Sequence, residues 1–84
     1  MYLTTESLAE QAQQNISSYG ISIDLDLARW VITEALFCAH TALLNGQGVD
    51  LDYLGQIKRL ELPGGPLLHY RADDSLYSSQ EAPR

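Results

Sequence analysis

The sequence predicts an α+β domain in which two N-terminal helices precede a three-stranded antiparallel sheet and a short C-terminal helix. Three observations lead to this prediction. Apolar residues recur at helical spacing as far as residue 44. From residue 49 onward they alternate with polar residues, as in half-buried strands. Glycine and proline mark the boundaries between these segments.

The first helix is expected from about Thr5 to Tyr19. Apolar residues at steps of four, four and three form one stripe along it, and the opposite face is polar. A hydroxyl at Thr4, Thr5 or Ser7 can cap the start of this helix, and Gly20 stands where a left-handed residue commonly ends one. The pattern predicts a helix with one face in the core.

The second helix is expected to start at Ser22 or Asp24 and to reach Leu44. Only three of the 15 residues from 28 to 42 are strongly polar, which is typical of a helix buried on all sides. A chain of 84 residues can hardly surround such a helix, so we expect a second protomer to cover its other face. The residues assigned to this core and dimer interface are Trp30, Val31, Ala35, Phe37, Cys38 and Leu44.

Three strands are expected in the second half of the chain. The first is predicted where apolar residues at 49, 51 and 53 alternate with Asp50 and Asp52. The second covers 57–62, and its alternation breaks at Lys58-Arg59, which predicts a bulge there. The sequence Pro63-Gly64-Gly65-Pro66 predicts a tight turn before a third strand at 67–72. A short helix over 73–79 completes a single domain, residues 1–79, and residues 80–84 are expected to form a frayed tail.

The charge balance narrows the classes of function. Eleven acidic residues face five basic ones, a net charge of −6, which argues against a generic nucleic-acid binder and against adhesion to an anionic membrane. The single cysteine, Cys38, excludes an internal disulfide. We find no apolar run of transmembrane length and no signal-peptide pattern, so a cytoplasmic protein is expected.

Three segments taken together resemble the HU/IHF family of bacterial DNA-bending proteins. Residues 42–49, ALLNGQGV, resemble the turn by which the family's long helix enters its first strand. Leu54, Gly55 and Ile57 match apolar, glycine and apolar positions of the family's Gly-Phe-Gly-x-Phe signature. In the third segment, residues 70–76, the residues that match the family's pattern are Tyr70, Arg71 and Leu76.

Departures from the family pattern qualify what the resemblance implies. Tyr53 replaces the first glycine of the signature, Ala72 replaces a proline, and Asp74 stands where a basic residue is common. Only the short stretch of residues 61–66, which includes the end of the second strand, leads into the third strand, and this leaves no room for the family's long arm with its intercalating proline. Pro63 and Pro66 are therefore not assigned that role. The resemblance implies an intertwined dimer with a shortened hairpin, an acidic member of the family that lacks the arm.

Lys58, Arg59 and Arg71 are the candidate DNA-contacting residues. The stretch from residue 56 to residue 71 sums to +2, and a dimer would double this to +4 on its sheet surface. Such a patch can contact phosphates only at low salt. In the alternative interpretation these are solvated strand residues that pair with nearby carboxylates.

The acidic residues suggest a different surface, one that presents carboxylates where DNA presents phosphates and so occupies a DNA-binding protein. The alternative interpretation is ordinary: helix caps and solvent-facing strand positions. The residues concerned are Asp24, Asp26, Asp50, Asp52, Asp73 and Asp74.

The sequence predicts no catalytic, metal or cofactor site and no small-molecule substrate. Cys38 and His40 are two apart on a helix and so do not share a face, and no further ligands complete a metal set. We therefore expect a non-enzymatic homodimer that acts as a protein-interaction or regulatory factor in a nucleic-acid-handling context. The alternative is a weak direct DNA-binding protein that uses the basic patch.

Overall fold

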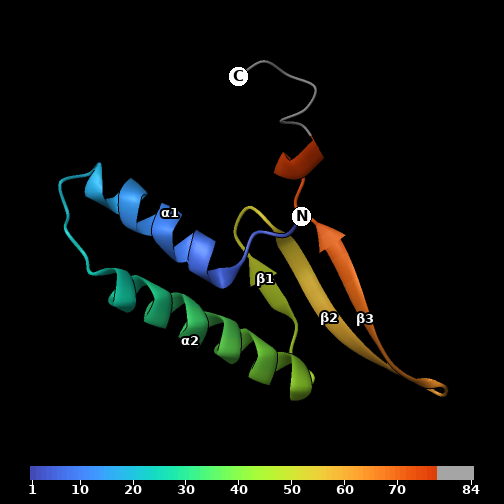
Figure 1. Cartoon of the computed structure of the whole chain (residues 1–84). Coiled ribbons are helices and arrows are strands. Elements are labelled where there is room, and N and C mark those ends of the chain that lie inside the picture. The colour runs from blue at the N-terminus through green and yellow to red at the C-terminus, as the bar shows by residue number, and fades with distance from the viewer. Residues whose placement is uncertain (78–84) are drawn as a thin grey trace. The chain divides into compact units, whose positions relative to one another are not determined.

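The computed structural model describes residues 1–77 and contains two helices followed by three strands (Figure 1). A single helical turn at residues 75–77 follows the last strand. The α+β class and the predicted order of elements are confirmed. The predicted end of the C-terminal helix at residues 78–79 and the tail at 80–84 lie outside the described residues. The elements are α1 (Thr5–Ser17), α2 (Leu25–Leu44), β1 (Val49–Leu51), β2 (Gly55–Leu62) and β3 (Gly65–Ala72).

The chain divides into two compact units, residues 1–38 and residues 39–84. In the first unit, Thr4 caps α1, because its hydroxyl oxygen accepts a hydrogen bond from the backbone N–H of Ser7 at 3.2 Å. The guanidinium of Arg29 on α2 lies 3.0 Å from the carboxylate of Glu6 on α1. These contacts fix both the start of α1 and its link to α2.

The bounds of α2 follow from its two caps. The Asp24 carboxylate accepts the backbone N–H of Asp26 at 3.1 Å, so the helix starts at the second of the two predicted positions. At the other end Gly46 has a φ of 83°, and the N–H of Gln47 donates to the carbonyl of Ala42 at 2.9 Å. This is the Schellman arrangement, which ends the helix at the predicted Leu44.

The outer side of α2 is exposed in the single chain. Ala28, on the covered side of the helix, is 4% exposed. On the outer side, the side chain of Trp30 is 72% exposed and that of Phe37 is 61% exposed. A core formed by one chain therefore does not include the six residues assigned to the core and interface. Their place in an interface with a second protomer stays a prediction. The exposed residues are Trp30, Val31, Ala35, Phe37, Cys38 and Leu44.

By length and composition alone, α2 is also a candidate to cross a membrane. This corrects the expectation that no segment of the chain reaches the length of such a span. Core helices of soluble proteins have the same length and composition, so the finding is weak evidence for a membrane location.

The second unit contains a sheet in the order β1-β2-β3, with both pairs antiparallel. The register of β2 and β3 is unbroken from Gly55 opposite Ala72 to Leu62 opposite Gly65. The predicted bulge at Lys58-Arg59 is therefore wrong, since both residues pair in register.

The reason for the broken alternation is the short length of β1, which pairs only with residues 55–57 of β2. Beyond this point β2 and β3 continue as a two-stranded ribbon, closed by Pro63-Gly64. Most residues of this ribbon are exposed on both of its faces. Charged and apolar side chains can therefore occupy both faces without a change in the backbone.

Candidate functional site

The polar face of the sheet brings together two of the three predicted DNA-contacting residues. Cross-strand neighbours in an antiparallel sheet project to the same side. Lys58 is opposite His69, and Arg71 is opposite Gln56, which is in turn opposite Asp50 on β1. We call these five residues the polar face: Asp50, Gln56, Lys58, His69 and Arg71.

Arg59 does not belong to this face. It follows Lys58 directly on β2 and is opposite Leu68, so its side chain projects to the other side of the sheet. There its guanidinium pairs with the Glu61 carboxylate at 2.8 Å, and its side chain is 29% exposed. The predicted basic patch is thus split into a pair of cations on one face and an ion-paired arginine on the other.

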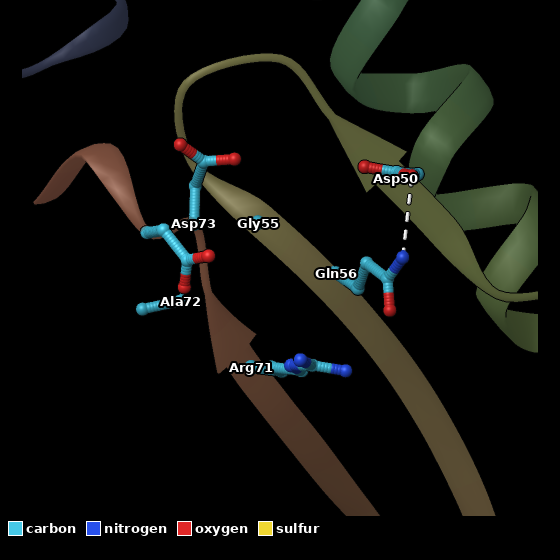
Figure 2. A pocket seen from close by; sticks show the side chains of 7 residues that line it. Asp50, Gly55, Gln56, Arg71, Ala72 and Asp73 are labelled. Atoms are coloured by element: carbon cyan, nitrogen blue, oxygen red, sulfur yellow. Dashed lines mark hydrogen bonds between the residues drawn. The ribbon is translucent and has the colours of Figure 1, made fainter.

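Carboxylates accompany the two cations of the polar face. Asp50 accepts a hydrogen bond from the Gln56 side-chain amide at 3.2 Å, and Figure 2 shows this pair beside Arg71. The hollow at this end of the sheet has a volume of about 240 Å³ and three carboxylates against one guanidinium. Its electrostatic character is therefore acidic. It is lined by Asp50, Gly55, Gln56, Arg71, Ala72, Asp73 and Asp74.

Four of the six predicted acidic surface residues have local partners. Asp24 caps α2, and Asp26 pairs with Arg29 at 2.6 Å. Asp73 accepts hydrogen bonds from the hydroxyl and the backbone N–H of Ser75, the latter at 3.0 Å. These bonds, that of the hydroxyl first, lower the pKa of the Asp73 carboxyl below its ordinary value.

Among the described residues, Asp52 and Asp74 have neither a hydrogen bond nor an ion pair through their side chains. They are thus the members of the acidic set whose carboxylates have no local partner. Asp52 lies in the turn after β1, and Asp74 follows β3. Both carboxylates are exposed, as the ordinary interpretation expects of solvent-facing residues, but Asp52 lies in the turn and not in the strand.

The turn between β1 and β2 presents an aromatic side chain that sequence reasoning did not single out as a functional residue. Tyr53 has a φ of 71°, and its side chain is 79% exposed. The carbonyl of Leu54 accepts the Tyr70 hydroxyl at 2.6 Å and the backbone N–H of Asp73 at 3.0 Å. The signal in the sequence was that a tyrosine stands at a glycine position of the HU/IHF pattern.

A second hollow in the same unit, of about 290 Å³, is largely apolar. It lies where the last turn of α2 and the β2–β3 ribbon supply its walls, and it too was not expected from the sequence. Arg59 and His40 are its polar members. Its lining consists of His40, Leu43, Leu44, Arg59, Pro66, Leu67 and Leu68.

Within residues 1–77, no three metal-ligating side chains gather at one place. Cys38 is exposed on α2, and the two histidines lie on different elements, His40 on α2 and His69 on β3. The candidate features for function described above are the polar face, the two hollows and the exposed turn at Tyr53.

Comparisons of the chain with models of known protein families, with curated proteins and with solved structures found no match.

Proposed function

We propose that this protein is a non-enzymatic, dimeric module of HU/IHF-like architecture that acts through protein contacts in a nucleic-acid-handling context. The observation that carries the proposal is the arrangement of charge on the sheet. Lys58 and Arg71 share their face with Asp50, while Arg59 is turned away and paired with Glu61. A phosphate-binding surface needs uncompensated cations, and this sheet offers few.

The exposure of the apolar helix α2 supports a dimer. Ala28 is its one buried residue in the single chain. A helix that is apolar on nearly all sides is typically covered on all sides, and a second chain could supply the missing cover.

The apolar stripe on the outer side of α2 is the surface proposed for this contact. Trp30, Phe37 and Leu44 are seven residues apart, so they lie in line along one side of the helix. All three are more than half exposed, at 72%, 61% and 58%. An exposed stripe of large apolar side chains is typical of a surface that binds another protein.

The charge of the assembly supports contact with protein over contact with DNA. A dimer carries twice −6, or −12, so the phosphate backbone of DNA would be repelled. The β2–β3 ribbon continues for only five residue pairs beyond β1, from Lys58 opposite His69 to Leu62 opposite Gly65, which is short for an arm that embraces DNA.

A second candidate function, weak direct DNA binding, is favoured by one observation: Lys58, His69 and Arg71 lie on the same face. Two cations per protomer would give four per dimer, enough for contact with phosphates at low salt. A salt slope of about −0.9 is expected for each phosphate neutralised, so this binding would weaken steeply as salt rises.

Sedimentation equilibrium and a duplex-DNA titration at low salt test the proposal. We expect the mass of a dimer and no duplex binding. A monomeric mass throughout the accessible concentration range would contradict the dimer. Duplex binding that is abolished by the double substitution Lys58→Ala, Arg71→Ala would overturn the protein-contact function and establish the DNA-binding alternative. The matched control is Arg59→Ala, which removes one positive charge from the opposite face.

A further inference from the structure

We propose that the turn between β1 and β2 is a docking site for an arginine side chain of a cationic protein partner, with the Tyr53 ring as its platform. This inference rests on the proposed function, because it names the chemistry of the partner that the module contacts. The site consists of Asp52, Tyr53 and Leu54 in the turn, with Asp73 and Asp74 after β3.

The backbone of Tyr53 is in an unfavourable conformation. Its φ of 71° lies in the left-handed region, where a side chain with a Cβ crowds the following carbonyl and where glycine is free of strain. A bulky residue there is uncommon, and it persists only when its surroundings hold it in place. The contacts that hold the turn in place are at the next residue, Leu54, because its carbonyl accepts hydrogen bonds from the Tyr70 hydroxyl and the Asp73 backbone N–H.

Nothing within the described chain compensates the strain through packing of the ring. The Tyr53 side chain is 79% exposed, and its hydroxyl makes no hydrogen bond with residues 1–77. The neighbouring Leu54 is also 52% exposed. A strained, fixed turn that displays an aromatic and an apolar side chain to solvent is explained if a partner covers them.

The charges around the turn specify the partner as cationic. Asp52 lies in the turn itself, and the backbone N–H of Asp73 bonds to Leu54 within it. Three carboxylates, those of Asp50, Asp73 and Asp74, line the acidic hollow with the single guanidinium of Arg71. Asp52 and Asp74 make no hydrogen bond or ion pair with other described side chains, so both can pair with an incoming cation.

Arginine fits this combination better than lysine. The planar guanidinium stacks on an aromatic ring and at the same time presents a fork of donors to carboxylates. A lysine ammonium has the charge but neither the plane nor the fork. A nucleic acid base can also stack on a tyrosine, but its phosphates would meet the carboxylates of the turn.

The probe is a nona-arginine peptide, with nona-lysine as the comparison, titrated into the full chain and followed by the backbone amide signals of Tyr53 and Leu54. We expect the arginine peptide to bind more tightly and to shift these two signals. The substitution Tyr53→Gly should weaken arginine binding about two- to fivefold, the range for an exposed cation–π contact. It should leave lysine binding nearly unchanged.

The melting temperature of the Tyr53→Gly variant gives a second readout, and it should rise while arginine binding weakens. Glycine relieves the left-handed strain, so Tyr53→Gly should raise the Tm while it weakens arginine binding. The matched control is Tyr19→Ala, which removes another exposed tyrosine, 80% exposed and far along the sequence, and should leave arginine binding unchanged. A lower Tm for Tyr53→Gly would show that the ring supports the fold, and would overturn the inference.

Three other results would also overturn it. Equal affinity for the two peptides would leave only non-specific attraction to an acidic protein. Dissociation of the dimer by Tyr53→Gly would make a second copy the occupant of the turn. Shifts of the Tyr53 signal by duplex DNA would make the occupant a nucleic acid. The dimer mass and the duplex titration test the proposed function without either peptide. A failure of the arginine-docking inference can therefore be distinguished from a failure of the proposed function.

Discussion

Lys58 and Arg59 are adjacent in the sequence, and the unbroken register of β2 and β3 places their side chains on opposite faces of the sheet. Lys58 faces the same side as Arg71, together with Asp50. Arg59 faces the other side and pairs with Glu61. The local charge of +2 that the sequence shows between residues 56 and 71 is therefore not the charge of any one surface.

The Arg59–Glu61 ion pair should contribute little to stability. The side chains are 29% and 69% exposed, so solvent screens much of their attraction. A double-mutant cycle with Arg59→Ala and Glu61→Ala, measured by urea unfolding, should give a coupling of less than about 1 kcal/mol that falls as salt is added. A larger coupling that salt does not change would indicate that a second protomer buries the pair.

Gly55 is a position where only glycine fits. Its φ is 125°, and a Cβ there would lie 2.2 Å from the carbonyl oxygen of Arg71. Because the obstacle is the backbone of β3, the strands would have to separate. Gly55→Ala should therefore destabilise the fold by at least about 3 kcal/mol, the upper end of the usual range for a single substitution.

Gly46→Ala is the matched control for this prediction. Gly46 also has a positive φ, 83°, but a Cβ there meets no atom within 4 Å. Its substitution should cost about 1–2 kcal/mol, for the left-handed backbone alone. Chemical denaturation of both variants makes the comparison, and equal losses of stability would mean that Gly55 is not held against β3 in solution.

Local features of the fold could be predicted from the sequence because they depend on a few neighbouring residues. Of the three hydroxyls that could cap α1, the structure uses Thr4, and it confirms the end of α2 at Leu44. Both ends depend on residue types at fixed offsets along the chain. The two faces of β3, with Tyr70 on one and Arg71 on the other, follow from the alternation of a strand.

Other features depend on lengths and contacts that composition does not reveal. The sequence does not show that β1 pairs only as far as Ile57, so the broken alternation at Lys58-Arg59 predicts a bulge that the structure does not have. The alternation of apolar and polar residues continues through Tyr53 and predicts a strand there, so the one signal of its left-handed backbone was its place at a glycine position of the compared pattern. The apolar pattern of α2 predicts that a second chain covers Trp30, which is 72% exposed in the single chain.

Asp73 should titrate below its ordinary value. Hydrogen bonds from Ser75 lower the pKa of this carboxyl from 3.8. A carboxyl whose pKa is lower in the folded state stabilises the fold above its unfolded pKa, and that contribution is lost as the pH falls through the folded value. We expect Ser75→Ala to raise the pKa toward 3.8, measured from the carboxyl carbon signal. An unchanged pKa in Ser75→Ala would show that the cap does not form in solution.

Trp30 gives the sharpest test of the dimer. Its side chain is 72% exposed in the single chain, so in a monomer Trp30→Ala should change stability little. In a dimer that covers the outer side of α2, the same change removes a large aromatic anchor and should weaken association by at least about 2 kcal/mol. That corresponds to a rise of about 30-fold in the dissociation constant, measurable by sedimentation across a range of concentrations. Tyr19→Ala, at an exposed tyrosine outside this stripe, should leave the dissociation constant unchanged. If Trp30→Ala instead leaves both the mass and the thermal unfolding of the protein unchanged, the outer side of α2 is not the interface.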